Sequence, residues 1–176
     1  MANWCRNDIQ FEGEQKNIDR VQKVFQKMMD IEERTNQGQR FLLIEKNTDV
    51  NYLFDIVFDE GSENLSFETK WSPDPKQFII IAQMFNVSFT YSAEEMGNNI
   101  YCEYKYNPEE NILYDRELGG EDFENARVCE NESHTKDMDE CDEDKNCYYE
   151  TDYEYLDDLL MDKEWNESEE VQMPTI

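Results

Sequence analysis

Apolar and polar residues alternate with a period of two in several segments of the first two thirds of this chain, which requires strands that bury one face only. The segment NLSFETKWS shows the pattern most cleanly, because one side of the expected strand carries Leu65, Phe67, Thr69 and Trp71. Residues 51–61 alternate in part, so a strand and a short helix both remain open there. Further strands are expected within residues 7–14, 39–46, 87–92, 98–107 and 111–117.

Two segments repeat apolar residues at the three- and four-residue spacing of a helix. Residues 17–33 form the first, and Asn17 is a candidate for its N-cap. The second covers residues 72–85, with Ser72 before Pro73 at its expected start. The apolar residues expected to pack on a sheet are Ile18, Val21, Val24, Phe25, Met28 and Met29 in the first helix and Phe78, Ile79, Ala82, Met84 and Phe85 in the second.

The order strand, helix, strand, strand, helix, strand, followed by a hairpin, is typical of a ferredoxin-like α+β sandwich. This is the split βαβ arrangement, in which an antiparallel sheet carries two helices on one face. A chain of 176 residues has room for one such domain and an appendage. We therefore expect a ferredoxin-like domain at residues 1–116 and an extension at residues 117–176.

The net charge of −27 is unevenly distributed along the chain. Residues 1–116 contain 12 basic and 21 acidic residues, a net charge of −9, whereas residues 117–176 contain 4 and 22, a net charge of −18. This asymmetry is typical of an acidic interaction segment joined to an ordinary domain. The aromatic content of 13% argues against wholesale disorder.

The extension combines its carboxylates with apolar anchors. In YEYLDDLLMDKEW, residues 153–165, Leu156, Leu159 and Leu160 recur at helical spacing and predict an amphipathic acidic helix. Such a helix either docks on the sheet or engages a partner, and the sequence leaves both open. The residues expected to bind a partner are Asp142, Glu143, Asp144, Tyr149, Glu150, Asp152, Tyr153, Glu154, Tyr155, Asp157, Asp158, Asp162, Glu164 and Trp165.

Metal-binding patterns in the extension are incomplete. Cys129, His134, Cys141 and Cys147 lack the two-residue separation that presents paired thiolates to zinc, so reduced cysteines are the preferred interpretation and zinc stays an alternative. A calcium loop counted from Asp142 has oxygen donors at positions 1, 3, 5 and 9. It has Cys147 where glycine is needed and Tyr153 where a bidentate glutamate is needed. We expect no cofactor.

The sequence also argues against catalysis and against direct nucleic-acid binding. His134 is the only histidine, and no phosphate-binding glycine loop or nucleophile motif is present. No basic patch is evident that would neutralise phosphates. The aromatic residues that would otherwise suggest base stacking are expected in the core, namely Trp4, Trp71, Tyr101, Tyr104 and Tyr106.

No apolar run reaches the roughly 18 residues that a membrane helix needs, and the opening MANWCRNDIQ does not resemble a signal peptide. We therefore expect a soluble, intracellular protein. Its five cysteines are expected to be reduced thiols.

Three segments resemble the YubB-type ferredoxin-like domain family of phage and plasmid proteins. They are the opening MANWC.N, the strand that ends in TKWSP, and the later EY strand after a glycine-containing turn. The resemblance covers roughly residues 1–116, and residues 117–176 have no counterpart in it. It implies a ferredoxin-like fold and a mobile-element setting, and hence the cytoplasm of a bacterial host cell, but no catalytic residues.

Two functions follow from charge and setting. The first is an inhibitor of a host defence protein, of the anti-CRISPR or antirestriction type, whose carboxylates replace phosphates on a basic nucleic-acid-binding surface. The second is a non-inhibitory interaction module in phage assembly or regulation. Neither is an enzyme.

Overall fold

The computed structural model describes residues 3–30, 38–39, 52–58, 64–129 and 149–167. In chain order its first elements are β1 (Trp4–Glu12), α1 (Gln15–Asp30), β2 (Phe54–Phe58), β3 (Asn64–Lys70), α2 (Lys76–Phe85), β4 (Ser88–Glu95), η1 (Met96–Asn98), β5 (Ile100–Asn107) and β6 (Ile112–Glu117). They are followed by α3 (Gly120–Asn125), β7 (Arg127–Cys129), β8 (Tyr149–Thr151), α4 (Tyr153–Asp162) and β9 (Asn166–Glu167). None of these helices is long and apolar enough to cross a membrane.

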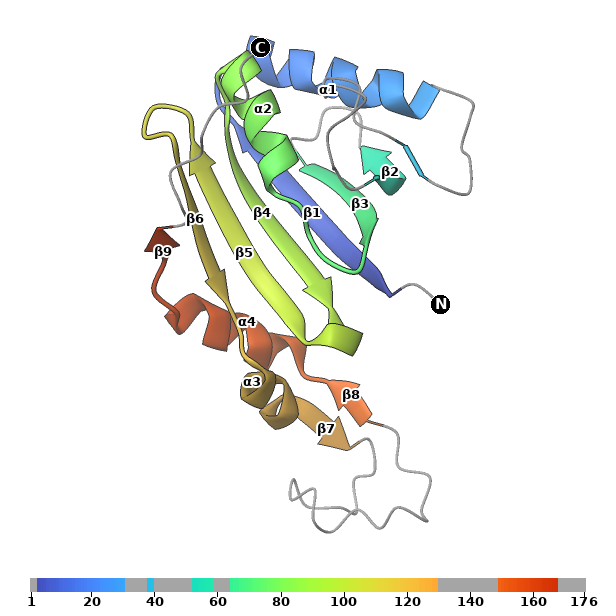
Figure 1. Cartoon of the computed structure of the whole chain (residues 1–176), viewed down its shortest axis with the longest axis vertical. Coiled ribbons are helices and arrows are strands. Elements are labelled where there is room, and N and C mark those ends of the chain that lie inside the picture. Colours follow the sequence, from blue (N-terminus) through green and yellow to red (C-terminus); the bar gives the residue numbers. More distant parts are fainter. Residues whose placement is uncertain (1–2, 31–37, 40–51, 59–63, 130–148, 168–176) are drawn as a thin grey trace.

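The large sheet has the strand order β2-β3-β1-β4-β5-β6-β9, and all neighbouring strands are antiparallel. Its first four strands, together with α1 and α2, follow the split βαβ order, so the predicted ferredoxin-like α+β fold is confirmed. The added hairpin of β5 and β6 widens the sheet beside β4. Figure 1 shows α1 and α2 against one face of the sheet, and α3 and α4 at its other end beside β5 and β6.

Strand alternation places the main core between the sheet and the helices α1 and α2. In β1 every second residue is buried, and the others are exposed. In β3 and β4 every second residue is also buried, but the residues between them are mostly half-buried; the core residues of these strands include Leu65, Phe67 and Tyr91. From α1 the core receives Ile18, Val21, Phe25 and Met28, and from α2 it receives Phe78, Ile79, Ile81, Ala82 and Phe85.

Several local predictions were wrong. Asn17 is not an N-cap, because α1 begins at Gln15 and Asn17 is buried within its first turn. The second helix begins at Lys76 rather than at Ser72, and Met84 points outward with 46% of its surface exposed. Trp71 leaves the buried side of β3, because its φ of 73° ends the strand in the left-handed region and its side chain is 52% exposed.

The segment left open between strand and helix is strand β2, which pairs with β3 across an irregular register between Phe54 and Val57. The strand expected at residues 39–46 lies outside the described residues, except for Gln39. Gln39 forms an isolated bridge with Leu53.

A buried hydrogen-bond network joins β1, β3 and β4. Asn7 Nδ2 donates to the backbone oxygen of Cys5 at 2.7 Å and to Thr69 Oγ1 at 3.1 Å. Asn7 Oδ1 accepts from the Tyr91 hydroxyl at 2.6 Å, and Thr69 Oγ1 donates to the backbone oxygen of Ser72 at 2.9 Å. The MANWC.N and TKWSP segments therefore hold neighbouring strands together from inside the core.

Candidate functional site

The predicted acidic helix is present as α4, Tyr153–Asp162. Asp152 is its N-cap, because the Asp152 carboxylate accepts a hydrogen bond from the Tyr155 backbone nitrogen at 3.0 Å. Leu156 and Leu160 are buried, while the rest of the helix is half-buried or exposed. The apolar side of α4 therefore faces the protein itself.

A second, smaller core holds α4 in place. It is formed by Leu118, Phe123, Ala126, Leu156 and Leu160, with Tyr101 and Leu159 packed against it. This cluster is separate from the main core and lies on the other face of the sheet, because Tyr101 alternates along β5 with the core residue Cys102. Of the two roles left open for the acidic helix, docking on the sheet is the one seen here.

Trp165 fixes the segment that follows α4. Its ring makes cation–π contacts with Lys105 Nζ, 4.1 Å from the ring centroid, and with Arg116 Cζ, 4.5 Å from it. Arg116 also donates to the backbone oxygen of Met161 at 3.3 Å, which is in the last turn of α4. Beyond Trp165, β9 pairs with β6. One arginine thus connects the sheet, the end of α4 and the chain that follows it.

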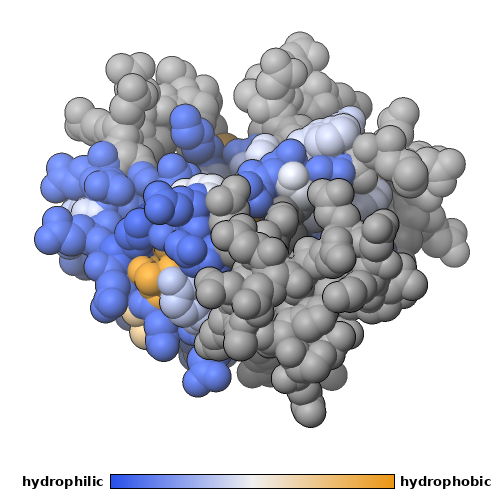
Figure 2. Space-filling view, turned by 90° about the horizontal axis from the view of Figure 1, so that it is seen from below, coloured by the Kyte–Doolittle hydropathy of each residue, from blue (hydrophilic) through white to orange (hydrophobic). Residues whose placement is uncertain are grey.

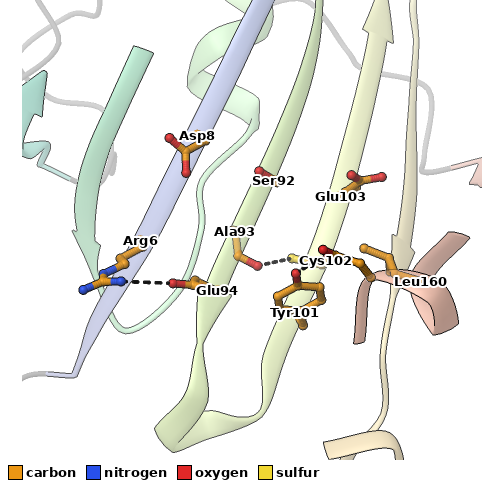
Figure 3. A pocket seen from close by; sticks show the side chains of 10 residues that line it. Arg6, Asp8, Ser92, Ala93, Glu94, Tyr101, Cys102, Glu103 and Leu160 are labelled. Atoms are coloured by element: carbon orange, nitrogen blue, oxygen red, sulfur yellow. Dashed lines mark hydrogen bonds and ion pairs between the residues drawn. The ribbon is translucent and has the colours of Figure 1, made fainter. Parts of the chain in front are cut away.

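A hollow with a volume of about 240 Å³ lies between α4 and the face of the sheet that α1 and α2 leave open. Its floor comes from three neighbouring strands, β1, β4 and β5 (Figure 3). The register sets Arg6 opposite Glu94 and Glu94 opposite Tyr101. In the next row it sets Asp8 opposite Ser92, which in turn lies opposite Glu103. The lining residues are Arg6, Asp8, Ser92, Ala93, Glu94, Tyr101, Cys102, Glu103, Asp157 and Leu160.

Each carboxylate of the hollow is oriented by a neighbouring donor. Ser66 Oγ donates to Asp8 Oδ1, and the Tyr101 hydroxyl donates to Asp157 Oδ1 at 2.5 Å. Arg116 Nε and Nη2 donate to Glu103 Oε2 at 2.9 and 2.5 Å, and Arg6 Nη1 lies 3.5 Å from Glu94 Oε1. Of these contacts, the one between Arg6 and Glu94 is the longest.

Tyr101 lines the hollow, and Tyr153 is the first residue of α4. Burial raises the pKa of Tyr101, and the hydrogen bond to Asp157 raises it further, so this hydroxyl stays protonated and donates at neutral pH. Burial also raises the pKa of Tyr153, with opposing contributions from Glu94, which raises it, and Arg6, which lowers it. The centroids of the two rings are 6.5 Å apart.

The carboxylates on the outer side of α4 continue the charge of the hollow. Glu154, Asp158 and Asp162 follow one another at four-residue spacing and are all exposed. We call these three residues, together with Asp8, Glu94, Glu103 and Asp157, the acidic surface. Seen from the end of the sheet where α3 and α4 lie, most of the visible described surface is hydrophilic (Figure 2).

The predicted partner-binding residues are placed unequally. Asp142, Glu143 and Asp144 lie outside the described residues, and Tyr149 and Glu150 are described only as part of β8. Asp152, Tyr153 and Trp165 make contacts within the molecule, as cap, ring partner and cation clamp. Tyr153 is also exposed, as are Glu154, Tyr155, Asp157, Asp158, Asp162 and Glu164.

Sequence reasoning missed the contribution of the sheet. Asp8 and Glu103 belong to the alternating segments 7–14 and 98–107, in which polar residues are simply expected to face solvent, and Arg6 and Glu94 lie just outside the segments expected as strands. The available signal was that the outward positions of three strands carry charges. Only the strand order and register bring those charges together.

Metal and thiol chemistry receive no support from the part of the chain that the structure describes. No group of His, Cys, Asp and Glu there is arranged to hold a metal ion. The proposed zinc ligands His134, Cys141 and Cys147 lie outside that part, and Cys129 is described only as part of β7. Cys5 and Cys102 are buried free thiols.

Comparison with known families matches residues 51–149 to the family described as the ferredoxin-like domain in Api92-like protein. The match extends from the start of the β2 region into β8 and includes 99 of the 176 residues. Comparisons with curated proteins and with solved structures give no match. Because the family model matches more than half of the chain, and the fold is the one that the family name describes, this chain belongs to the family of the ferredoxin-like domain in Api92-like proteins.

Proposed function

We propose that this chain is an acidic inhibitor of a host defence protein, of the restriction or CRISPR type. It binds a basic nucleic-acid-binding surface of that protein, and its carboxylates take the positions of phosphates. The observation that carries this proposal is the acidic surface itself. Three of its carboxylates, Asp8, Glu94 and Glu103, lie on the sheet, and the second core holds α4, which carries the other four, against β5.

The geometry suits a basic groove. Successive residues of the row Glu154, Asp158 and Asp162 are separated by a rise of about 6 Å along the helix axis. A partner that lines its channel with Lys and Arg therefore meets regularly spaced charges on a fixed support. The strong net charge of −27 steers such an encounter over longer distances.

The assignment of the inhibitor to host defence rests on analogy. The opening MANWC.N and the TKWSP strand resemble the YubB-type domains of phage and plasmid proteins, and acidic proteins that replace nucleic acid are of use to such elements. No direct contact with nucleic acid is part of this proposal.

The test uses three residues whose side chains are exposed. Glu154→Lys, Asp158→Lys and Asp162→Lys reverse the row on α4 and change the net charge by +6. Asp152 and Asp157 are left unchanged, because the first caps α4 and the second accepts from Tyr101. The matched control is Glu12→Lys, Asp30→Lys and Glu109→Lys, which changes the charge equally at other exposed positions.

The full-length protein is immobilised and exposed to host extract, and retained proteins are challenged with added DNA or RNA. We expect a nucleic-acid-binding protein that nucleic acid displaces, that the control variant retains and that the α4 variant loses. Expression of the same three proteins during phage challenge then measures protection of the phage. Retention of the partner without any protection would favour the non-inhibitory interaction module, and equal retention by the α4 variant would refute the proposal.

A further inference from the structure

Arg6 is the one cation that lines the acidic hollow among the described residues. Its side chain is 72% exposed, and its single ion pair joins Nη1 to Glu94 Oε1 at 3.5 Å. Arg116 is held very differently, because its side chain is 13% exposed and donates twice to Glu103 Oε2. A long, exposed ion pair contributes little to stability, so Arg6 is free to leave the hollow without unfolding its surroundings.

We propose that Arg6 is a specificity-determining residue of the acidic surface: it occupies the hollow until an arginine side chain of the basic partner displaces it. This inference rests on the proposed function and adds to it the chemical group that the partner inserts.

The size and chemistry of the hollow favour a single guanidinium group. About 240 Å³ accommodates one long side chain rather than an element of secondary structure. A guanidinium pairs with carboxylates through two parallel hydrogen bonds and stacks on aromatic rings, whereas an ammonium is a compact, strongly hydrated charge. The hollow supplies carboxylates from two directions, Glu94 on the sheet and Asp157 on α4, with the Tyr101 ring beside them.

The molecule already contains an arginine bound in this manner. Arg116 lies between the carboxylate of Glu103 and the ring of Trp165, and Glu103 is itself a wall of the hollow. A second guanidinium that enters the hollow meets the same two kinds of group. Arg6 opposes the entry of this second guanidinium, because it carries the same charge and already forms an ion pair with Glu94.

The test measures fluorescence anisotropy of fluorescein-labelled deca-arginine and deca-lysine peptides with the full-length protein at 0.1 M salt. We expect deca-arginine to bind more tightly than deca-lysine. Arg6→Ala is expected to tighten deca-arginine binding by about two- to fivefold, as the loss of one exposed like-charge interaction implies. Arg6→Lys keeps the charge and is expected to change the affinity less.

Lys23→Ala is the matched control. It also removes one exposed positive charge, but from α1, on the face of the sheet away from the hollow. Because Arg6 and Lys23 are both exposed, the two variants are expected to unfold at the same temperature as the unchanged protein, which thermal denaturation verifies.

An equal gain in affinity for Arg6→Ala and Lys23→Ala would overturn the inference, because net charge alone would then explain it. Equal binding of the two peptides, or weaker binding by Arg6→Ala, would overturn it as well. If the α4 triple reversal abolishes deca-arginine binding while Arg6→Ala leaves it unchanged, the inference about Arg6 fails and the proposed function stands. If the unchanged protein binds neither peptide, the inference fails, and the capture experiment decides the proposed function separately.

Discussion

Asn7 shows at the scale of one residue how this fold places polar chemistry inside its core. The side chain is 1% exposed, and both its donor and its acceptor are engaged, by groups on β1, β3 and β4. A buried amide without such partners would destabilise the fold, so the strands on either side must stay in register with it. Asn7 of the opening segment and Thr69 of the TKWSP segment therefore belong to one structural network.

Tyr91→Phe tests this network. The change removes the hydroxyl that donates to Asn7 Oδ1 at 2.6 Å and leaves that oxygen the thiol of Cys5 at 3.7 Å, a weak donor. We expect a loss of about 1–2 kcal/mol in the free energy of unfolding, measured by chemical denaturation. Tyr104→Phe is the control, because among the described residues the Tyr104 hydroxyl has one hydrogen-bond contact, with the Cys102 thiol at 3.6 Å, and a smaller loss is expected. Equal losses would contradict the network.

The two buried thiols make a second prediction at this scale. Burial raises the pKa of Cys5 to about 12 and that of Cys102 to about 11. At pH 8 the thiolate fraction of either is then about one in a thousand or less, so iodoacetamide should leave both unmodified in the folded protein and alkylate both in urea. Peptide mass spectrometry measures the modification. Because the folded-state pKa values exceed the ordinary 9.0, the thiols favour folding below pH 9, and this contribution disappears as the pH rises toward 11 and 12.

Periodicity predicts correctly whether a side chain is buried when the residue lies inside a strand, and it fails at the end of the strand. Leu65, Phe67 and Thr69 are buried as the alternation of β3 predicts. Trp71 continues the same alternation but follows the strand in a left-handed conformation. At this turn the Trp71 backbone nitrogen donates to the Asn3 oxygen, a contact between distant parts of the chain that the alternation of β3 does not encode.

At the scale of an element, α4 was predictable as a helix but not in its surroundings. The spacing of Leu156, Leu159 and Leu160 identifies its apolar side, and the structure confirms it. The partners of that side are Leu118, Phe123 and Ala126, which come from a short segment with no clear period of its own. The sequence alone therefore leaves docking on the sheet as one of two alternatives.

Leu160→Ala tests whether α4 depends on this second core. Leu160 is 4% exposed, and truncation of such a leucine costs about 2–5 kcal/mol. The cluster contains few residues, so we expect α4 to lose its attachment while the main core stays folded. Hydrogen exchange should show faster exchange in α4 and unchanged protection in β1 and β4. Met161→Ala, at a side chain that is 69% exposed, is the control, and global loss of protection in Leu160→Ala would contradict two separate cores.

At the scale of the whole molecule, the strand order determines which charged residues lie together, and the sequence alone does not show this. Charges on β1, β4 and β5 are far apart in the chain, yet the register places Arg6, Glu94 and Tyr101 in one row. The ferredoxin-like order was predictable from the sequence of elements, but the position of α4 against that row was not. The acidic hollow forms only because α4 lies against this row of strand residues.

The net charge of −27 predicts how stability responds to salt. In the folded state 43 acidic residues repel one another, and only 16 basic residues offset them. The Debye length falls from about 10 Å at 0.1 M to about 3 Å at 1 M salt, so the repulsion weakens more than the few ion pairs do. We expect the unfolding temperature to rise by roughly 2–4 °C or more between these concentrations of sodium chloride. A fall would mean that specific ion pairs dominate the stability.

The predicted boundary at residue 116 can be tested on the fragment of residues 1–116. Every buried residue of the main core lies between Cys5 and Leu113, so the fragment keeps that core intact. It loses the second core, and Arg116 loses both Trp165 and the Met161 oxygen. The net charge falls to −9, which reduces self-repulsion.

We therefore expect the fragment to unfold cooperatively, at a lower denaturant concentration than the full chain, and to keep the near-ultraviolet circular dichroism of packed aromatic residues. Tyr101 becomes more exposed in it, since α4 no longer covers that face of the sheet. A fragment without cooperative unfolding would show that α4 and β9 belong to the folding unit of the sheet. The acidic surface would then be part of the domain itself, and not an extension added to it.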